Sequence, residues 1–181
     1  MNGLVTFVNL VDRLNERVGR GVAWLTLLMV LITFSVAILR YVYAIGWVWL
    51  QESYVWLHGI VFMVGAGYAL LHNAHVRVDI FYRPSSLRYK AVVDLFGSLL
   101  LLLPLVVIVV MGSYGYVIDS WQRLEVSRET GGLPGLFLLK SVILVFCLLI
   151  GLQGLSLAAR SFLVLMGHPE FRPEEEETGP I

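Results

Sequence analysis

Residues 95–118 read LFGSLLLLLPLVVIVVMGSYGYVI, and this run of 24 residues contains no Asp, Glu, Lys or Arg. At about 1.5 Å rise per residue, an α-helix of that length spans roughly 36 Å, which exceeds the roughly 30 Å of a bilayer's hydrocarbon core. Three more runs of 19 residues lack the same four residue types, at 21–39, 53–71 and 141–159. The sequence therefore predicts an all-α integral membrane protein with four transmembrane helices.

The composition of the whole chain agrees with this fold class and excludes others. Of its 181 residues, 58% are hydrophobic and 14% are charged, whereas about 25% are charged in an average soluble domain. The formal net charge is zero and no basic stripe is interleaved with aromatic residues outside the spans, so we expect no nucleic-acid partner. The single cysteine, Cys147, excludes an intrachain disulfide and any zinc or redox site built from several cysteines.

The apolar runs and their flanks predict how the chain is organised. Before the first run, apolar residues recur at helical spacing and charged residues fall mainly on the other side, which is typical of an amphipathic helix lying in the membrane interface. The tail carries four consecutive glutamates between prolines and is expected to be disordered. The predicted parts are one domain over 1–170, an interfacial helix over about 4–19, spans over about 21–44, 49–71, 91–118 and 134–165, and an acidic tail over 171–181.

Local signals predict the connections between these helices. Residues 45–48 are short enough for a tight hairpin, so the first two spans should be antiparallel neighbours. Ser86 follows Pro84 and Ser85 and is placed to cap a helix that continues into the third span. Pro104 lies inside that span and should kink it, and Pro134 is placed to open the fourth helix.

The distribution of Lys and Arg predicts orientation, because these residues accumulate on the cytoplasmic side of a membrane. With four spans both termini share one side, and that side would hold nine of the thirteen basic residues. Both termini are therefore expected in the cytoplasm. Aromatic residues gather near the opposite ends of the spans, where their amphipathic rings favour the outer interface.

Four ionisable residues near the outer span ends form a candidate polar network. Arg40 and Glu52 lie about equally far from the first hairpin and could pair, while Asp119 and Lys140 fall in the same outer layer. They could line a substrate or ion pathway, or they could tie helices together at the interface. Small residues in the second span, which let helix backbones approach closely, indicate helix packing or a subunit interface instead: Gly59, Gly65, Ala66 and Gly67.

No cofactor or catalytic site is expected from the sequence. His58 and His72 could share one helical face, as haem ligands do in membrane cytochromes, but the axial partners on other spans are missing. No GxSxG, HExxH, Walker or Rossmann pattern occurs, so nothing indicates an enzyme. His75 and Asp79, four residues apart, are too few ligands for a metal site.

An ordered set of residues covers most of the chain: Arg40, Glu52, Gly65-Ala66, His75-Val76-Arg77-Val78-Asp79, Glu125, Ser127, Gly131-Gly132-Leu133-Pro134, Lys140 and Gln153-Gly154. With these residues the chain resembles the small membrane subunit, of the DctQ type, of TRAP (tripartite ATP-independent periplasmic) transporters. The roles of His75, Asp79, Pro134 and Gln153 stay open.

This resemblance implies a small permease subunit of the bacterial inner membrane, without catalytic residues. Its implied partners are a large membrane subunit, which holds the substrate and sodium sites, and a periplasmic substrate-binding protein that delivers an organic acid or related solute. The small subunit would scaffold the large one in the lipid bilayer during sodium-coupled uptake. The alternative is a membrane anchor of a respiratory complex that binds haem or quinone.

Overall fold

The computed structural model describes residues 2–74, 82, 84–168 and 171, and all regular secondary structure within that part is helical. The elements in chain order are α1 (Asn2–Val42), α2 (Val48–Val64), α3 (Ala66–Leu71), α5 (Leu87–Phe96), the π-helical turn η1 (Gly97–Leu102), α6 (Leu103–Gln122) and α7 (Leu136–Leu165).

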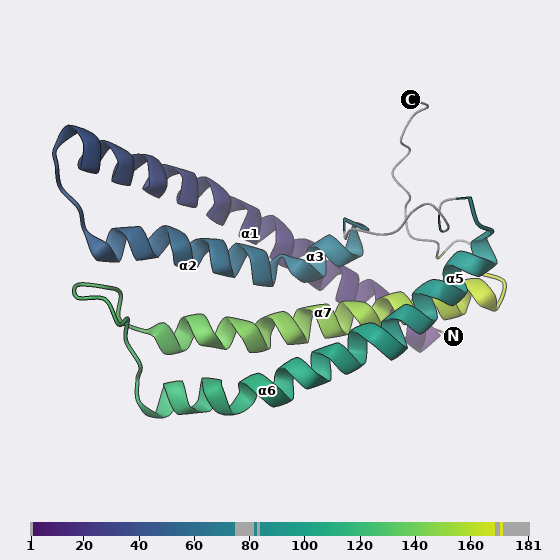
Figure 1. Cartoon of the computed structure of the whole chain (residues 1–181). Coiled ribbons are helices and arrows are strands. Elements are labelled where there is room, and N and C mark those ends of the chain that lie inside the picture. Colours follow the sequence, from purple (N-terminus) through teal and green to yellow (C-terminus); the bar gives the residue numbers. More distant parts are fainter. Residues whose placement is uncertain (1, 75–81, 83, 169–170, 172–181) are drawn as a thin grey trace.

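Four helical stretches are long and apolar enough to cross a membrane, which confirms the predicted number of spans. They run over Gly3–Val42, Val48–Leu71, Leu87–Gln122 and Leu136–Leu165. The turn between α1 and α2 and the loop between α6 and α7 lie at the same end of the molecule, on the left in Figure 1. We call this the hairpin end. The N-terminus and the C-terminal end of α7 lie at the opposite end.

Helix α7 is the centre of the molecule. Half of the residues in its most apolar window are buried inside the chain, against 0–11% in the other three spans. It contacts α1, α2, α3, α5, η1 and α6. Two glycines permit part of this close packing: a Cβ atom at Gly154 would lie 2.7 Å from Leu102 Cδ2, and one at Gly151 would lie 3.4 Å from Val106 Cγ1. The other helices therefore keep most of their apolar surface outside the chain.

Helix α1 differs from the prediction because nothing divides it. The expected interfacial helix over 4–19 and the first span form one helix of 41 residues, roughly 60 Å long, which is about twice the hydrocarbon thickness. Near its N-terminus, Val8, Val11 and Asn15 are buried, and this part of α1 packs on α3 and α7. One face of the segment is thus held by protein, and its location in the membrane interface stays a prediction.

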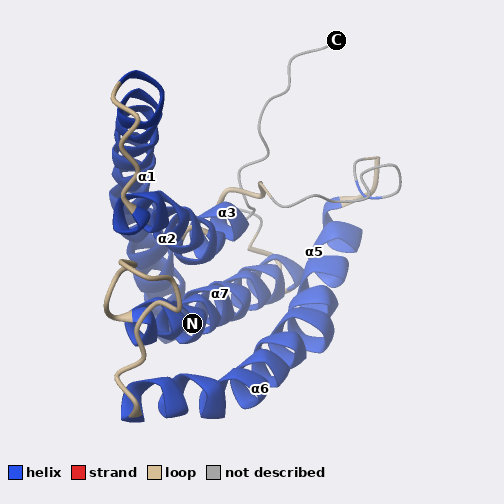
Figure 2. Cartoon of the chain, turned by 60° about the vertical axis from the view of Figure 1, so that its left-hand side comes forward, coloured by secondary structure: helices blue, strands red, loops and turns tan. Residues whose placement is uncertain are grey.

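The third span changes its helical pitch where Pro104 was expected to act. Proline has no N–H group and its ring clashes with the carbonyl four residues earlier. The turn before it, η1, is π-helical, and the run from α5 through η1 to α6 is visibly curved in Figure 2. A π turn accommodates such a defect by widening the helix locally.

The structure agrees with one predicted helix start, at Ser86, and moves the other by two residues, from Pro134 to Leu136. The Ser86 hydroxyl accepts a hydrogen bond from the backbone N–H of Tyr89 at 3.3 Å, so Ser86 caps α5 as expected. Helix α7 begins at Leu136, two residues after Pro134, and its N-cap is Gly135 with a φ of +94°. A left-handed φ at this position favours glycine.

Candidate functional site

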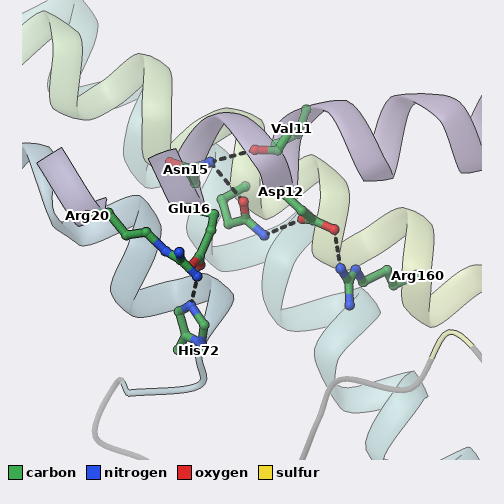
Figure 3. A network of polar contacts seen from close by, with 8 residues as sticks. Val11, Asp12, Asn15, Glu16, Arg20, His72 and Arg160 are labelled. Atoms are coloured by element: carbon green, nitrogen blue, oxygen red, sulfur yellow. Dashed lines mark hydrogen bonds and ion pairs between the residues drawn. The ribbon is translucent and has the colours of Figure 1, made fainter. Parts of the chain in front are cut away.

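A buried polar cluster joins the N-terminal part of α1 to the C-terminal half of α7 (Figure 3). Asp12 Oδ1 accepts hydrogen bonds from Gln153 Nε2 and from Ser156 Oγ, each at 2.9 Å. The other carboxylate oxygen of Asp12 pairs with the Arg160 guanidinium. Asn15, which is fully buried, donates from Nδ2 to Gln153 Oε1 at 2.8 Å. We call these five residues the α1–α7 cluster.

Helical spacing explains how the chain builds this cluster. Asp12 and Asn15 are three residues apart and share a face of α1, and residues 153, 156 and 160 follow one face of α7. Such a pair adds little net stability, because bringing charges out of water offsets much of the gain from pairing them. Once the pair is formed, however, removing one partner leaves the other charge without compensation.

Glu16 extends the contacts from α1 to the end of α3. Its carboxylate pairs with Arg20 Nε at 2.6 Å and with His72 Nε2 at 2.7 Å. The His72 ring also lies against Tyr68, with ring centroids 4.3 Å apart. His72 is therefore engaged by this chain, and in the described ranges no group of three or more His, Cys, Asp or Glu side chains is arranged to hold a metal ion.

A second polar cluster lies at the hairpin end, where the Glu52 carboxylate holds the outer loop. One Glu52 oxygen accepts from the Ser127 hydroxyl and the other from the backbone N–H of Leu133 at 2.6 Å. A Cβ atom at Gly132 would lie 2.7 Å from Glu52 Oε2 and 2.5 Å from Ser127 Oγ, so a side chain there would displace the carboxylate. Gly131 has a φ of +77°. The Gly-Gly-Leu-Pro motif thus binds the Glu52 carboxylate: Leu133 donates a backbone hydrogen bond, and Gly132 leaves room for the carboxylate.

Lys140 forms the other half of this hairpin-end cluster. It is 8% exposed and pairs with Glu125, whose carboxylate also accepts from the Ser120 hydroxyl at 2.7 Å. The Lys140 ammonium lies over the Tyr116 ring, 3.8 Å from its centroid. The hydrogen bond from Lys140, followed by that from Ser120, holds the pKa of Glu125 below its usual value.

Within the predicted network of Arg40, Glu52, Asp119 and Lys140, the pair that Arg40 and Glu52 could have made does not form. Among the ion pairs of the described residues, none joins Arg40 to Glu52 or Asp119 to Lys140. Arg40 and Asp119 are exposed, whereas Glu52 and Lys140 face the outer loop and take their partners from it. An equal distance from the hairpin does not give the rotation of each helix about its axis, and this rotation decides which side chains face each other.

The small residues of the second span contact this same chain. A Cβ atom at Gly67 would overlap Asn15 Oδ1 and lie 3.3 Å from the Leu149 carbonyl oxygen. A Cβ atom at Gly59 would lie 3.9 Å from Leu139 Cδ1 of α7, an ordinary van der Waals contact. Gly65 is the residue between α2 and α3, and Ala66 begins α3. Their part in contacts with another subunit stays a prediction.

The remaining predicted positions divide into three cases. Gln153 lies in the α1–α7 cluster, and Pro134 precedes the N-cap of α7. His75 and Asp79 lie outside the described residues. Sequence reasoning missed Asp12, Ser156 and Arg160. The i, i+3 and i+4 spacings that they share with Asn15 and Gln153 indicate a polar face on each helix, but not that the two faces meet.

Four spans and polar clusters at both ends of the bundle define a multi-pass membrane protein. Residues 28–164, more than half of the chain, match the family described as tripartite ATP-independent periplasmic transporters, DctQ component. The chain belongs to this family and is the small component of a TRAP transporter, which confirms the resemblance. The family is a transporter component and not an enzyme, and together with the spans it indicates the inner membrane. Comparisons with curated proteins and with solved structures find no match.

Proposed function

We propose that this chain scaffolds the large membrane subunit of a TRAP transporter. In this proposal, the large subunit carries out sodium-coupled uptake of an organic acid or related solute, which a periplasmic binding protein delivers. The observation that carries the proposal is membership of the DctQ family over residues 28–164.

The two polar clusters support a scaffold because they tie α7 to the rest of the bundle at both of its ends. Toward the C-terminal end of α7, Arg160 and Gln153 bind Asp12 of α1. At the hairpin end, Lys140 of α7 holds Glu125 of the outer loop, and Glu52 of α2 holds the same loop. A partner that moves in the bilayer needs a neighbour that resists deformation, and ties at two depths resist tilting of one helix against another.

The proposed orientation follows from the basic residues. With nine of thirteen Lys and Arg residues on the side of the termini, the termini face the cytoplasm and the hairpin end faces the periplasm. Glu52 and the outer loop that it binds would then lie on the side from which a periplasmic binding protein approaches.

Co-expression with the large subunit tests the proposal. The complex is purified through a tag on this chain, and uptake is measured in proteoliposomes with the large subunit alone and with both subunits. We expect the large subunit to co-purify and uptake to require this chain and a sodium gradient. Recovery of haem-bearing or redox proteins in place of the large subunit, with a Soret band in the absorbance spectrum, would contradict the proposal.

A further inference from the structure

An open apolar groove runs between α1 and α2 in the part of the bundle that crosses the membrane. Its volume is about 650 Å³, and it is lined by residues that include Val30, Phe34 and Ala37 of α1 and Val55 and His58 of α2. The groove lies within the residues that match the DctQ family.

The walls of the groove are not covered by this chain. Phe34 is 63% exposed and Val55 is 56% exposed, and no residue in the most apolar window of α1 is buried. The most apolar window of the third span is also only 6% buried, whereas that of α7 is half buried, so three of the four spans leave most of their apolar surface uncovered. Exposed apolar residues are normal next to lipid, and exposure alone does not identify what covers the groove.

His58 is the residue that helps to identify what covers the groove, because its polar side chain lines the groove near the middle of the membrane. It lies ten residues after Val48, roughly 15 Å along the helix from the hairpin end of α2, close to the middle of a hydrocarbon core of about 30 Å. Its side chain is exposed, and among the residues that the structure describes none forms a hydrogen bond with it. A polar group without a partner at this depth is costly, since lipid tails neither donate nor accept hydrogen bonds.

We propose that this groove binds a transmembrane helix of the large subunit, which presents a hydrogen-bonding side chain to His58. The inference rests on the proposed function and adds the face and the depth at which the two subunits meet. An acyl chain fills an apolar groove but leaves the imidazole unpaired. The small side chains of Thr33 and Ala37, four residues apart on α1 and both lining the groove, allow a helix to approach closely.

A second copy of this chain fits the groove less well. A two-fold dimer places the same surface patch on both sides of the interface, so one concave groove would face another. The two facing grooves would then enclose an empty space, and the residues that line it would lose van der Waals contacts. A convex helix from a different protein fills the groove instead.

Site-specific photo-crosslinking in native membranes tests the location. A photoreactive amino acid is placed at Phe34 or Val55 in the groove, and at Met111 as a matched control. Met111 is 76% exposed on α6 and lies eleven residues before the end of that helix at Gln122, so its depth matches that of His58. We expect adducts with the large subunit from the two groove positions and none from Met111.

Two results would overturn the inference while leaving the proposed function intact. One is co-purification of the large subunit with adducts from Met111 but not from the groove. The other is groove adducts that contain only lipid or a second copy of this chain. Failure of the large subunit to co-purify at all would instead overturn the proposed function, and this inference with it.

Variants of His58 test the hydrogen bond separately from the location. His58→Leu fills similar space without a polar group, and His58→Gln keeps a donor and an acceptor. We expect His58→Leu to weaken association with the large subunit in detergent about three- to tenfold, and His58→Gln to retain most of it. The same experiment includes Met111→Leu, which should change nothing. Equal association of the leucine and glutamine variants at wild-type strength would refute a role for His58.

Discussion

Replacing Asp12 with alanine should destabilise the bundle more than any change at the exposed residues beside it. The substitution removes the acceptor of two hydrogen bonds, from Gln153 and Ser156, and the only anion paired with Arg160 among the described residues. The Arg160 guanidinium then stays at the α1–α7 junction without compensation.

The magnitude follows from the burial of the pair. Removing one partner of a fully buried ion pair costs about 3–5 kcal/mol. The Arg160 side chain is 23% exposed and that of Asp12 is 12% exposed, so water can partly rehydrate the guanidinium and we expect about 2–3 kcal/mol. For a chain of this length, 1 kcal/mol shifts the unfolding midpoint by about 2–4 °C, which gives a decrease of about 4–12 °C.

Thermal unfolding in detergent, followed by the fluorescence of the five tryptophans, measures this decrease. Arg13→Ala is the matched control, since Arg13 is the exposed neighbour of Asp12 and should leave the midpoint within about 1 °C. The double variant Asp12→Ala with Arg160→Ala should lose clearly less than the sum of the single variants, because the two residues share one interaction. Additive losses, or an Asp12 variant as stable as the Arg13 variant, would refute the reasoning.

Three further predictions use other parts of the bundle. Glu52→Gln replaces one accepting oxygen by an amide N–H₂ that faces another donor, and should lower the free energy of unfolding by about 1.5–3 kcal/mol. We also expect less co-purification of the large subunit and less uptake. If stability, co-purification and uptake are all unchanged, Glu52 has no part in the scaffold. Gly67→Val should destabilise by about 1–3 kcal/mol in thermal unfolding because its side chain overlaps a buried amide of α1, whereas Gly112→Ala, which meets open space, should not. Because the pKa of Glu125 is lower in the folded than in the unfolded state, its ionised carboxylate stabilises the fold at pH values above the unfolded-state pKa of about 4.5. The unfolding midpoint should therefore fall as the pH drops below about 4.5. Glu125→Gln, which leaves Lys140 unpaired, should make the midpoint less dependent on pH in this range.

The spans could be predicted because the physical signal is local. A helix must be long and apolar enough to satisfy its backbone groups in lipid, and each such run is contiguous in the sequence. The proline in the third span and the serine that caps α5 also act within one or two turns, so their effects could be read from their neighbours. The undivided α1 could not, because Val8, Val11 and Asn15 are buried in it and the helix contacts α3 and α7, which lie far away in the sequence.

The candidate site required information that no single helix holds. Asp12 and Arg160 are 148 residues apart, and nothing near either one indicates its partner. The amphipathic pattern near the N-terminus placed Asp12 on the polar side, but Asp12 is buried together with the apolar Val8 and Val11. An acid can share the buried face of a helix when another helix brings the matching cation.

The same reasoning explains why the two polar clusters and the α1–α2 groove should serve different purposes. Glu52 and Lys140 find their partners inside the chain: the Glu52 carboxylate is hydrogen-bonded and the Lys140 charge is paired with Glu125 before any other subunit binds. His58 has no such partner among the described residues, and its polar group lies at a depth where neither water nor lipid headgroups can compensate it. A subunit that only had to be stable would gain by an apolar residue at this position. We therefore expect that replacing His58 with leucine leaves the isolated chain at least as stable as the wild type while weakening the complex, and a loss of stability in the isolated chain would show that the imidazole serves the bundle itself.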